Sequence, residues 1–144
     1  MTIIIEYIAV EKIENVLTQS LLIGQAFVYG DSFQSALVAI IVPDEEPIKN
    51  WAMKNNMNNK TMEELCMTKE LHDLIMKDIK GLAKNNGLHG FETPKAIFLE
   101  SNLFSVENDL ITPTFKLKRP QLRDYYQKQI DEMYASMPPP PSKL

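Results

Sequence analysis

The stretch from Ala36 to Val42 constrains the fold more than any other part of the sequence, because every residue in it is apolar. A run of this length suits a strand, and a strand without polar alternation must be covered on both faces. Pro43 ends the run, and the turn residues of 30–32 precede it. We therefore predict an antiparallel pair of strands over 25–30 and 35–42, at the centre of a covered sheet.

Other segments have the periodicity of helices and short strands. The N-terminal residues 3–7 alternate as a short strand would, and helical spacing begins at Val10. Thr61 and Glu64 have the spacing of a capping box, and an apolar stripe predicts a longer helix over 69–85. Residues 95–99 form a third strand candidate. Pro120 suits the first turn of a last helix, whose expected buried side is Leu122, Tyr125, Tyr126, Ile130, Met133 and Tyr134.

These elements predict a single α+β domain, in which helices flank a small, mainly antiparallel sheet. The chain has 144 residues, which is enough for one domain of ordinary size, and its sequence contains no internal repeat and no linker. We assign the domain to residues 1–137. The proline run that begins at Pro138 predicts an extended tail over 138–144.

Composition excludes several classes of site. A single Cys66 cannot form an internal disulfide or a multi-cysteine zinc site, and we expect it to pack as a small hydrophobe. His72 and His89 are far apart and lack the spacing of a metal site or a Ser/His arrangement, so we expect no metal. A net charge of −4 argues against nucleic acid as a partner. No apolar run approaches the ~20 residues of a transmembrane segment.

The segment from Leu110 to Pro120 is the one unusual concentration of cations in this acidic chain. If the part after Pro113 is extended, Thr114, Lys116 and Lys118 share one face, while Phe115 and Leu117 point towards packing. Arg119 and Arg123 follow at the entry to the last helix. Spacing alone leaves two interpretations open, a solvated basic surface and an anion site for phosphate or carboxylate.

Four stretches of the sequence resemble the C-terminal domain of long-chain fatty-acid–CoA ligases, which belong to the adenylate-forming (AMP-binding) superfamily. In chain order they are EYIAVEKIE, FVYGDSFQSALVAIIVPDEE, FETPKAIFLE and LITPTFKLKRPQLRDYYQKQIDEMY. The resemblance implies the small lid domain of that superfamily. It also implies a reaction in which ATP activates a fatty acid as an acyl-adenylate and CoA then displaces AMP.

The resemblance implies roles for the residues of the cationic segment. Lys116 matches the adenylation lysine of a Thr-x-Ser-Gly-Lys pattern, in which Thr112 matches the Thr, Thr114 stands for the Ser and Phe115 replaces the Gly. Lys118 and Arg119 are typical of the family, and we give them supporting roles towards phosphates or CoA. Thr112 and Thr114 are supporting candidates for binding substrate or cofactor. The resemblance implies ATP, CoA and Mg²⁺ as cofactors of the full enzyme, held mainly by its N-terminal domain.

The start of the chain resembles the lid loop that faces the active site during thioester formation, and Glu6 and Tyr7 are its candidate binding residues. The family has Gly where this chain has Ile5, and commonly Pro where it has Val10. The hinge expected upstream of this loop is missing. We therefore expect a fragment that is inactive alone, with the N-terminal domain, fatty acid, ATP and CoA as its partners.

Two further expectations concern the location of the protein in the cell and an alternative function. The resemblance implies an intracellular enzyme, with membrane association of the full-length protein left open. The alternative to a catalytic lid is a lid-derived module that binds another protein through its helical face or proline tail. This alternative predicts binding without any effect on the rate of a ligase.

Overall fold

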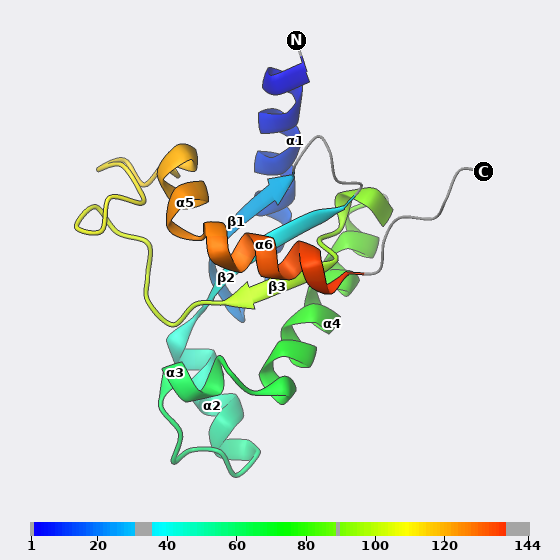
Figure 1. The fold of residues 1–144 in the computed structure, drawn as a ribbon. Helices are drawn as coiled ribbons and strands as arrows, with labels where there is room; N and C mark the ends of the chain where they lie inside the picture. Colours follow the sequence, from blue (N-terminus) through cyan, green and yellow to red (C-terminus); the bar gives the residue numbers. More distant parts are fainter. Residues whose placement is uncertain (1, 31–35, 89, 138–144) are drawn as a thin grey trace.

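A three-stranded sheet lies at the centre of the molecule (Figure 1). The computed structural model describes residues 2–30, 36–88 and 90–137, without the side chains of residues 2–9 and 91. Strand β1 (Ile23–Gly30) pairs antiparallel with β2 (Leu37–Pro43), and β2 pairs parallel with the shorter β3 (Ala96–Leu99). The predicted strand pair and the α+β class are therefore confirmed.

Helices cover the sheet on both faces. The elements outside the sheet are α1 (Thr2–Leu17), α2 (Glu45–Lys54), α3 (Met62–Leu65), α4 (Lys69–Asn85), the short 3₁₀ helix η1 (Gly90–Glu92), α5 (Arg119–Tyr125) and α6 (Gln127–Ser136). Among the described helices, none has the length and apolar composition needed to cross a membrane.

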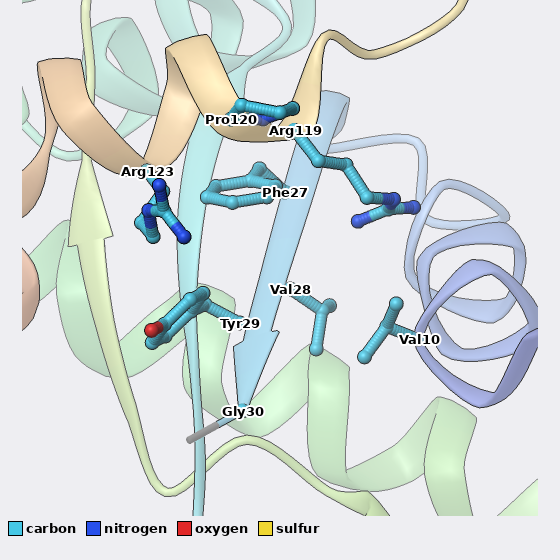
Figure 2. A pocket seen from close by; sticks show the side chains of 8 residues that line it. All are labelled: Val10, Phe27, Val28, Tyr29, Gly30, Arg119, Pro120 and Arg123. Atoms are coloured by element: carbon cyan, nitrogen blue, oxygen red, sulfur yellow. The ribbon is translucent and has the colours of Figure 1, made fainter. Parts of the chain in front are cut away.

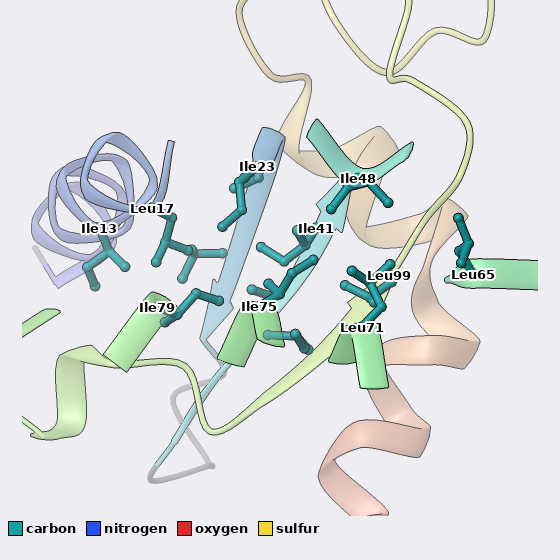
Figure 3. Packing of buried hydrophobic residues seen from close by; sticks show 14 of the residues in the cluster. Ile13, Leu17, Ile23, Ile41, Ile48, Leu65, Leu71, Ile75, Ile79 and Leu99 are labelled. Carbon is teal, nitrogen blue, oxygen red and sulfur yellow. The ribbon is translucent and has the colours of Figure 1, made fainter. Parts of the chain in front are cut away.

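Strand β2 supplies both cores, because successive side chains of a strand point to opposite faces. Ala39 and Ile41 join the larger cluster with α1 and α4, as Figure 3 shows for Ile41. Val38 and Ile40 join the second cluster, which contains residues of α5 and α6. The apolar run over 36–42 is thus explained, because helices cover both faces of the strand that it forms.

The N-terminal segment is helical, so the strand predicted over 3–7 is wrong. The lid loop implied for Glu6 and Tyr7 also lies within the backbone of α1. Neither Gly nor Pro interrupts residues 2–17, since Ile5 and Val10 stand where the resemblance has Gly and Pro. Without a residue that breaks a helix, the one predicted from Val10 extends towards the N-terminus.

The helices predicted over 61–64 and 69–85 are confirmed, together with their caps. The Thr61 hydroxyl and the Glu64 carboxylate form both halves of the capping box. Thr68 caps α4, because its hydroxyl accepts from the N–H of Leu71 (3.2 Å). These caps satisfy N–H groups that lack partners within the helix.

The prediction of a single last helix is wrong, because the segment divides at Tyr126 into two helices, α5 and α6. The predicted burial of Tyr125 is also wrong, because its side chain is exposed, while Tyr126 is buried and donates to Glu100 Oε1 (2.7 Å). The proline tail predicted over 138–144 lies outside the described residues.

Candidate functional site

The cationic segment forms a tight hairpin between the second core and the start of α5. Its stems meet at an antiparallel bridge between Ile111 and Leu117. The Lys118 N–H donates to the Leu110 carbonyl, and the Thr112 N–H donates to the Lys116 carbonyl, both at 2.9 Å. Leu110 and Ile111 are buried, so the hairpin is anchored in the core at its first stem.

Thr112 closes the tip of the hairpin. Its carbonyl accepts from the Phe115 N–H (2.8 Å), and its Oγ1 accepts from the Lys116 N–H (3.1 Å). The hydroxyl oxygens of Thr112 and Thr114 also form a hydrogen bond of 3.0 Å. Both threonines therefore have a local structural role, in which they hold the backbone around Lys116.

Lys116 is exposed on this hairpin, and its ammonium has no ion-pair or hydrogen-bond partner among the residues that the structure describes. A lysine side chain on a flexible stem can therefore reach an anion supplied from outside the domain. This arrangement fits the interpretation of the segment as an anion site.

The extended conformation predicted after Pro113 is wrong. Phe115 has a φ of 66° and is 81% exposed, so it does not point towards packing. Leu117 does pack against the second core. The reversal at 112–116 depends on a left-handed residue, and strand alternation cannot predict such a residue.

Lys118 and Arg119 are held within the domain. The Lys118 ammonium pairs with Asp109, beside the base of the hairpin. Arg119 makes a two-pronged ion pair with Glu14, with Nη1–Oε2 and Nη2–Oε1 distances of 3.0 Å and 2.6 Å. Neither cation is as free to meet an external phosphate as Lys116 is, and their supporting role towards phosphates or CoA stays a prediction.

Glu14 is a residue that the sequence interpretation missed. Its side chain is 9% exposed, and Oε2 also accepts from the Val28 N–H of β1 (2.7 Å). Burial raises the pKa of Glu14, and the Arg119 guanidinium and the Val28 N–H partly offset that effect. The signal was available, because Glu14 is four residues after Val10 and three before Leu17, both of which are buried.

A small cavity of about 80 Å³ lies beside this ion pair, between α1, β1 and α5 (Figure 2). Val10, Phe27 and Tyr29 give it apolar walls, and Arg119 and Arg123 line it from α5. The guanidinium carbon of Arg119 lies 5.9 Å from the centroid of the Phe27 ring. The ring thus supports the arginine from the side of the sheet.

Comparison with known proteins shows what this chain is similar to. No family model matches the chain. The chain is 50% identical over 129 residues to mouse long-chain-fatty-acid–CoA ligase 6, a match that covers 90% of the chain and 18% of the ligase. It is 45% identical over 130 residues to Arabidopsis thaliana long chain acyl-CoA synthetase 2, with 90% and 20% covered. The chain is thus similar to one segment of long-chain fatty-acid–CoA ligases.

A solved structure extends the comparison to the AMP-binding superfamily. The adenylation domain of a carboxylate reductase from Mycobacterium chelonae matches with a TM-score of 0.73 and 31% identity. The match covers 88% of this chain and 18% of that one. The chain spans about a fifth of the length of the ligases that it matches.

Three residues singled out in the sequence lie away from the hairpin. Glu6 and Tyr7 lie in the backbone of α1, and their side chains are outside the described part of the structure. Cys66 is half-buried against the larger core, and burial, with a smaller contribution from Glu100, raises its pKa to about 11. A thiol with this pKa is a weak nucleophile at neutral pH, in agreement with a packing role.

The left-handed backbone at Phe115 gives a test of the hairpin. The superfamily pattern has Gly at this position, which adopts positive φ without steric cost. We expect Phe115→Gly to raise the free energy of unfolding by up to about 1 kcal/mol, because the exposed ring loses little burial. Phe115→Val should lower it by about 1 kcal/mol. Urea unfolding of the two variants checks the order, and a more stable Val variant would contradict the conformation described.

Proposed function

We propose that this chain is the C-terminal lid domain of a long-chain fatty-acid–CoA ligase and that Lys116 is its adenylation lysine. In the full enzyme, the fatty-acid carboxylate would attack the α-phosphate of ATP, giving acyl-adenylate and pyrophosphate. The thiol of CoA would then attack the acyl carbon and release AMP and a proton. The N-terminal domain would hold ATP with its Mg²⁺, the acyl chain and most of CoA.

The observation that carries this proposal is the free ammonium of Lys116 on a closed hairpin. Within the described residues, the other two cations at the end of this segment are engaged with Asp109 and Glu14. The Lys116 ammonium needs no internal pair to be broken before it meets a phosphate or carboxylate. The cost of reorganising the lid around the reacting groups is therefore small.

The chemistry of adenylation needs such a charge. The attacking carboxylate and the α-phosphate are both anions, and negative charge spreads over the phosphate oxygens as the new bond forms. An ammonium between them offsets their repulsion and stabilises the transition state. The hairpin fixes the backbone at Lys116 through Thr112, while the aliphatic stem lets the charge reach across a domain boundary.

The lid itself would act by moving. Rotation of a small domain over a bound nucleotide excludes water and completes the catalytic set of residues. Lys116 would thus be present in the adenylation pose and withdrawn in the pose that admits CoA. This proposal makes the chain necessary but insufficient for activity.

A chimeric ligase tests the proposal. This chain replaces the matched segment of the mouse relative, and fatty-acid-dependent pyrophosphate release is measured against the same ligase without any such segment. We expect activity to return with this chain and with its Lys128→Ala variant, which changes an exposed lysine of α6. A chimera that folds but releases no pyrophosphate, while the mouse segment restores release, would contradict the proposal.

A further inference from the structure

The Glu14 carboxylate connects α1, β1 and the start of α5, the helix that follows the Lys116 hairpin. Glu14 from α1 accepts from the Val28 N–H of β1 and holds the Arg119 guanidinium at the start of α5 through two hydrogen bonds. Figure 2 shows Arg119 extending between Phe27 of β1 and the helix that carries Val10. Arg119 follows Lys116 by three residues, directly after the hairpin closes at Lys118.

We infer that the Glu14–Arg119 pair positions Lys116 for the adenylation step, an inference that rests on the function proposed above. The hairpin's own hydrogen bonds fix its shape, but its direction relative to the sheet depends on its two stems. The first stem is fixed by the buried Leu110 and Ile111. The second stem is held by Leu117, which packs on the second core, and by Arg119, which Glu14 ties to β1. Glu14 and Arg119 are therefore positioning residues.

The geometry of the pair suits this role better than a single charge contact would. Two parallel N–H···O bonds fix the orientation of the guanidinium plane as well as its distance. Glu14 is itself held by the N–H of Val28, so the arginine is tied to the sheet backbone and not to a mobile side chain. Phe27 limits movement of the guanidinium on the opposite side.

Two conservative variants test the inference in the chimeric ligase. Glu14→Gln keeps an oxygen that can accept from Val28 but removes the charge, and Arg119→Lys keeps the charge but removes the two-pronged contact. We expect each to slow pyrophosphate release about 10- to 100-fold, because small misplacements of a catalytic group are costly. Thioester formation from preformed acyl-adenylate should change by less than about twofold, since Lys116 is not used in that step.

An exposed ion pair supplies the matched control. Lys69 and Asp73 pair on the surface of α4 at 2.8 Å, and Asp73→Asn makes the same chemical change as a Glu→Gln substitution. This variant should leave both half-reactions unchanged. Hydrogen exchange in the isolated chain gives a second readout, in which the Lys116 and Lys118 amides should exchange about tenfold faster in Glu14→Gln but not in Asp73→Asn.

The double variant separates this inference from the proposed function. If Lys116→Ala slows adenylation about 100-fold and Glu14→Gln adds no further loss to the residual rate, the two residues act through the same step. The inference is overturned if both half-reactions fall together in a folded Glu14→Gln protein, or if its loss persists in full in the Lys116→Ala background. Normal adenylation by Lys116→Ala would instead refute the proposed function.

Discussion

Replacing Lys116 by alanine should slow fatty-acid-dependent pyrophosphate release about 100-fold or more in a ligase that carries this chain. The substitution removes an exposed ammonium without a partner among the described residues, so the domain should stay folded. The loss should appear in kcat more than in KM, because the charge acts mainly when negative charge spreads over the phosphate. Single-turnover measurement of acyl-adenylate formation gives the rate of this step directly.

The second half-reaction is the internal control for this variant. Lys116→Ala supplied with preformed acyl-adenylate should still form the CoA thioester at close to the rate of the unmodified protein. A variant that loses both half-reactions would assign Lys116 to general binding or to domain closure. A variant that keeps rapid adenylation would remove the catalytic role altogether.

Replacing Leu71 by alanine should destabilise the isolated chain by about 3 kcal/mol. Leu71 lies in the first turn of α4 and is fully buried in the larger core, where Figure 3 places it beside Leu99 of β3. Truncation there removes favourable burial and leaves a cavity that the surrounding side chains fill only in part. Urea unfolding, followed by far-ultraviolet circular dichroism, gives the change in free energy.

The matched control for Leu71 is the same substitution at an exposed site. Leu21 is 84% exposed in the turn before β1, so Leu21→Ala should change the free energy of unfolding by less than about 0.5 kcal/mol. Equal losses in the two variants would mean that α4 does not pack on the sheet as described.

Patterns within short stretches of the sequence predicted the helices and strands whose ends and buried faces are set by neighbouring residues. Helix α4 matches its predicted range because a long apolar stripe and a threonine cap agree on the same segment. The strand pair follows from an apolar run between a turn and a proline. The order of the predicted helices and strands gave the α+β class, although one of the two strand pairings is parallel.

The errors arise where local patterns compete or where distant residues decide. The alternation over 3–7 is too short to distinguish a strand from the first turns of a helix, and α1 extends through it. The hairpin at Lys116 depends on a positive φ at Phe115, which no periodicity reveals. Helical spacing could have placed Glu14 on the buried face of α1, but its ion pair could not be derived, because Arg119 lies 105 residues away.

The carboxylate of Glu14 also has a consequence for how copies of this chain behave towards one another. Strand β1 lies at the edge of the sheet, and edge strands offer N–H groups to which a strand of another molecule can pair. Glu14 occupies the Val28 N–H from within the same chain. A strand approaching this edge would have to displace a buried acidic group, so the contact also protects the folded protein against aggregation through sheet extension.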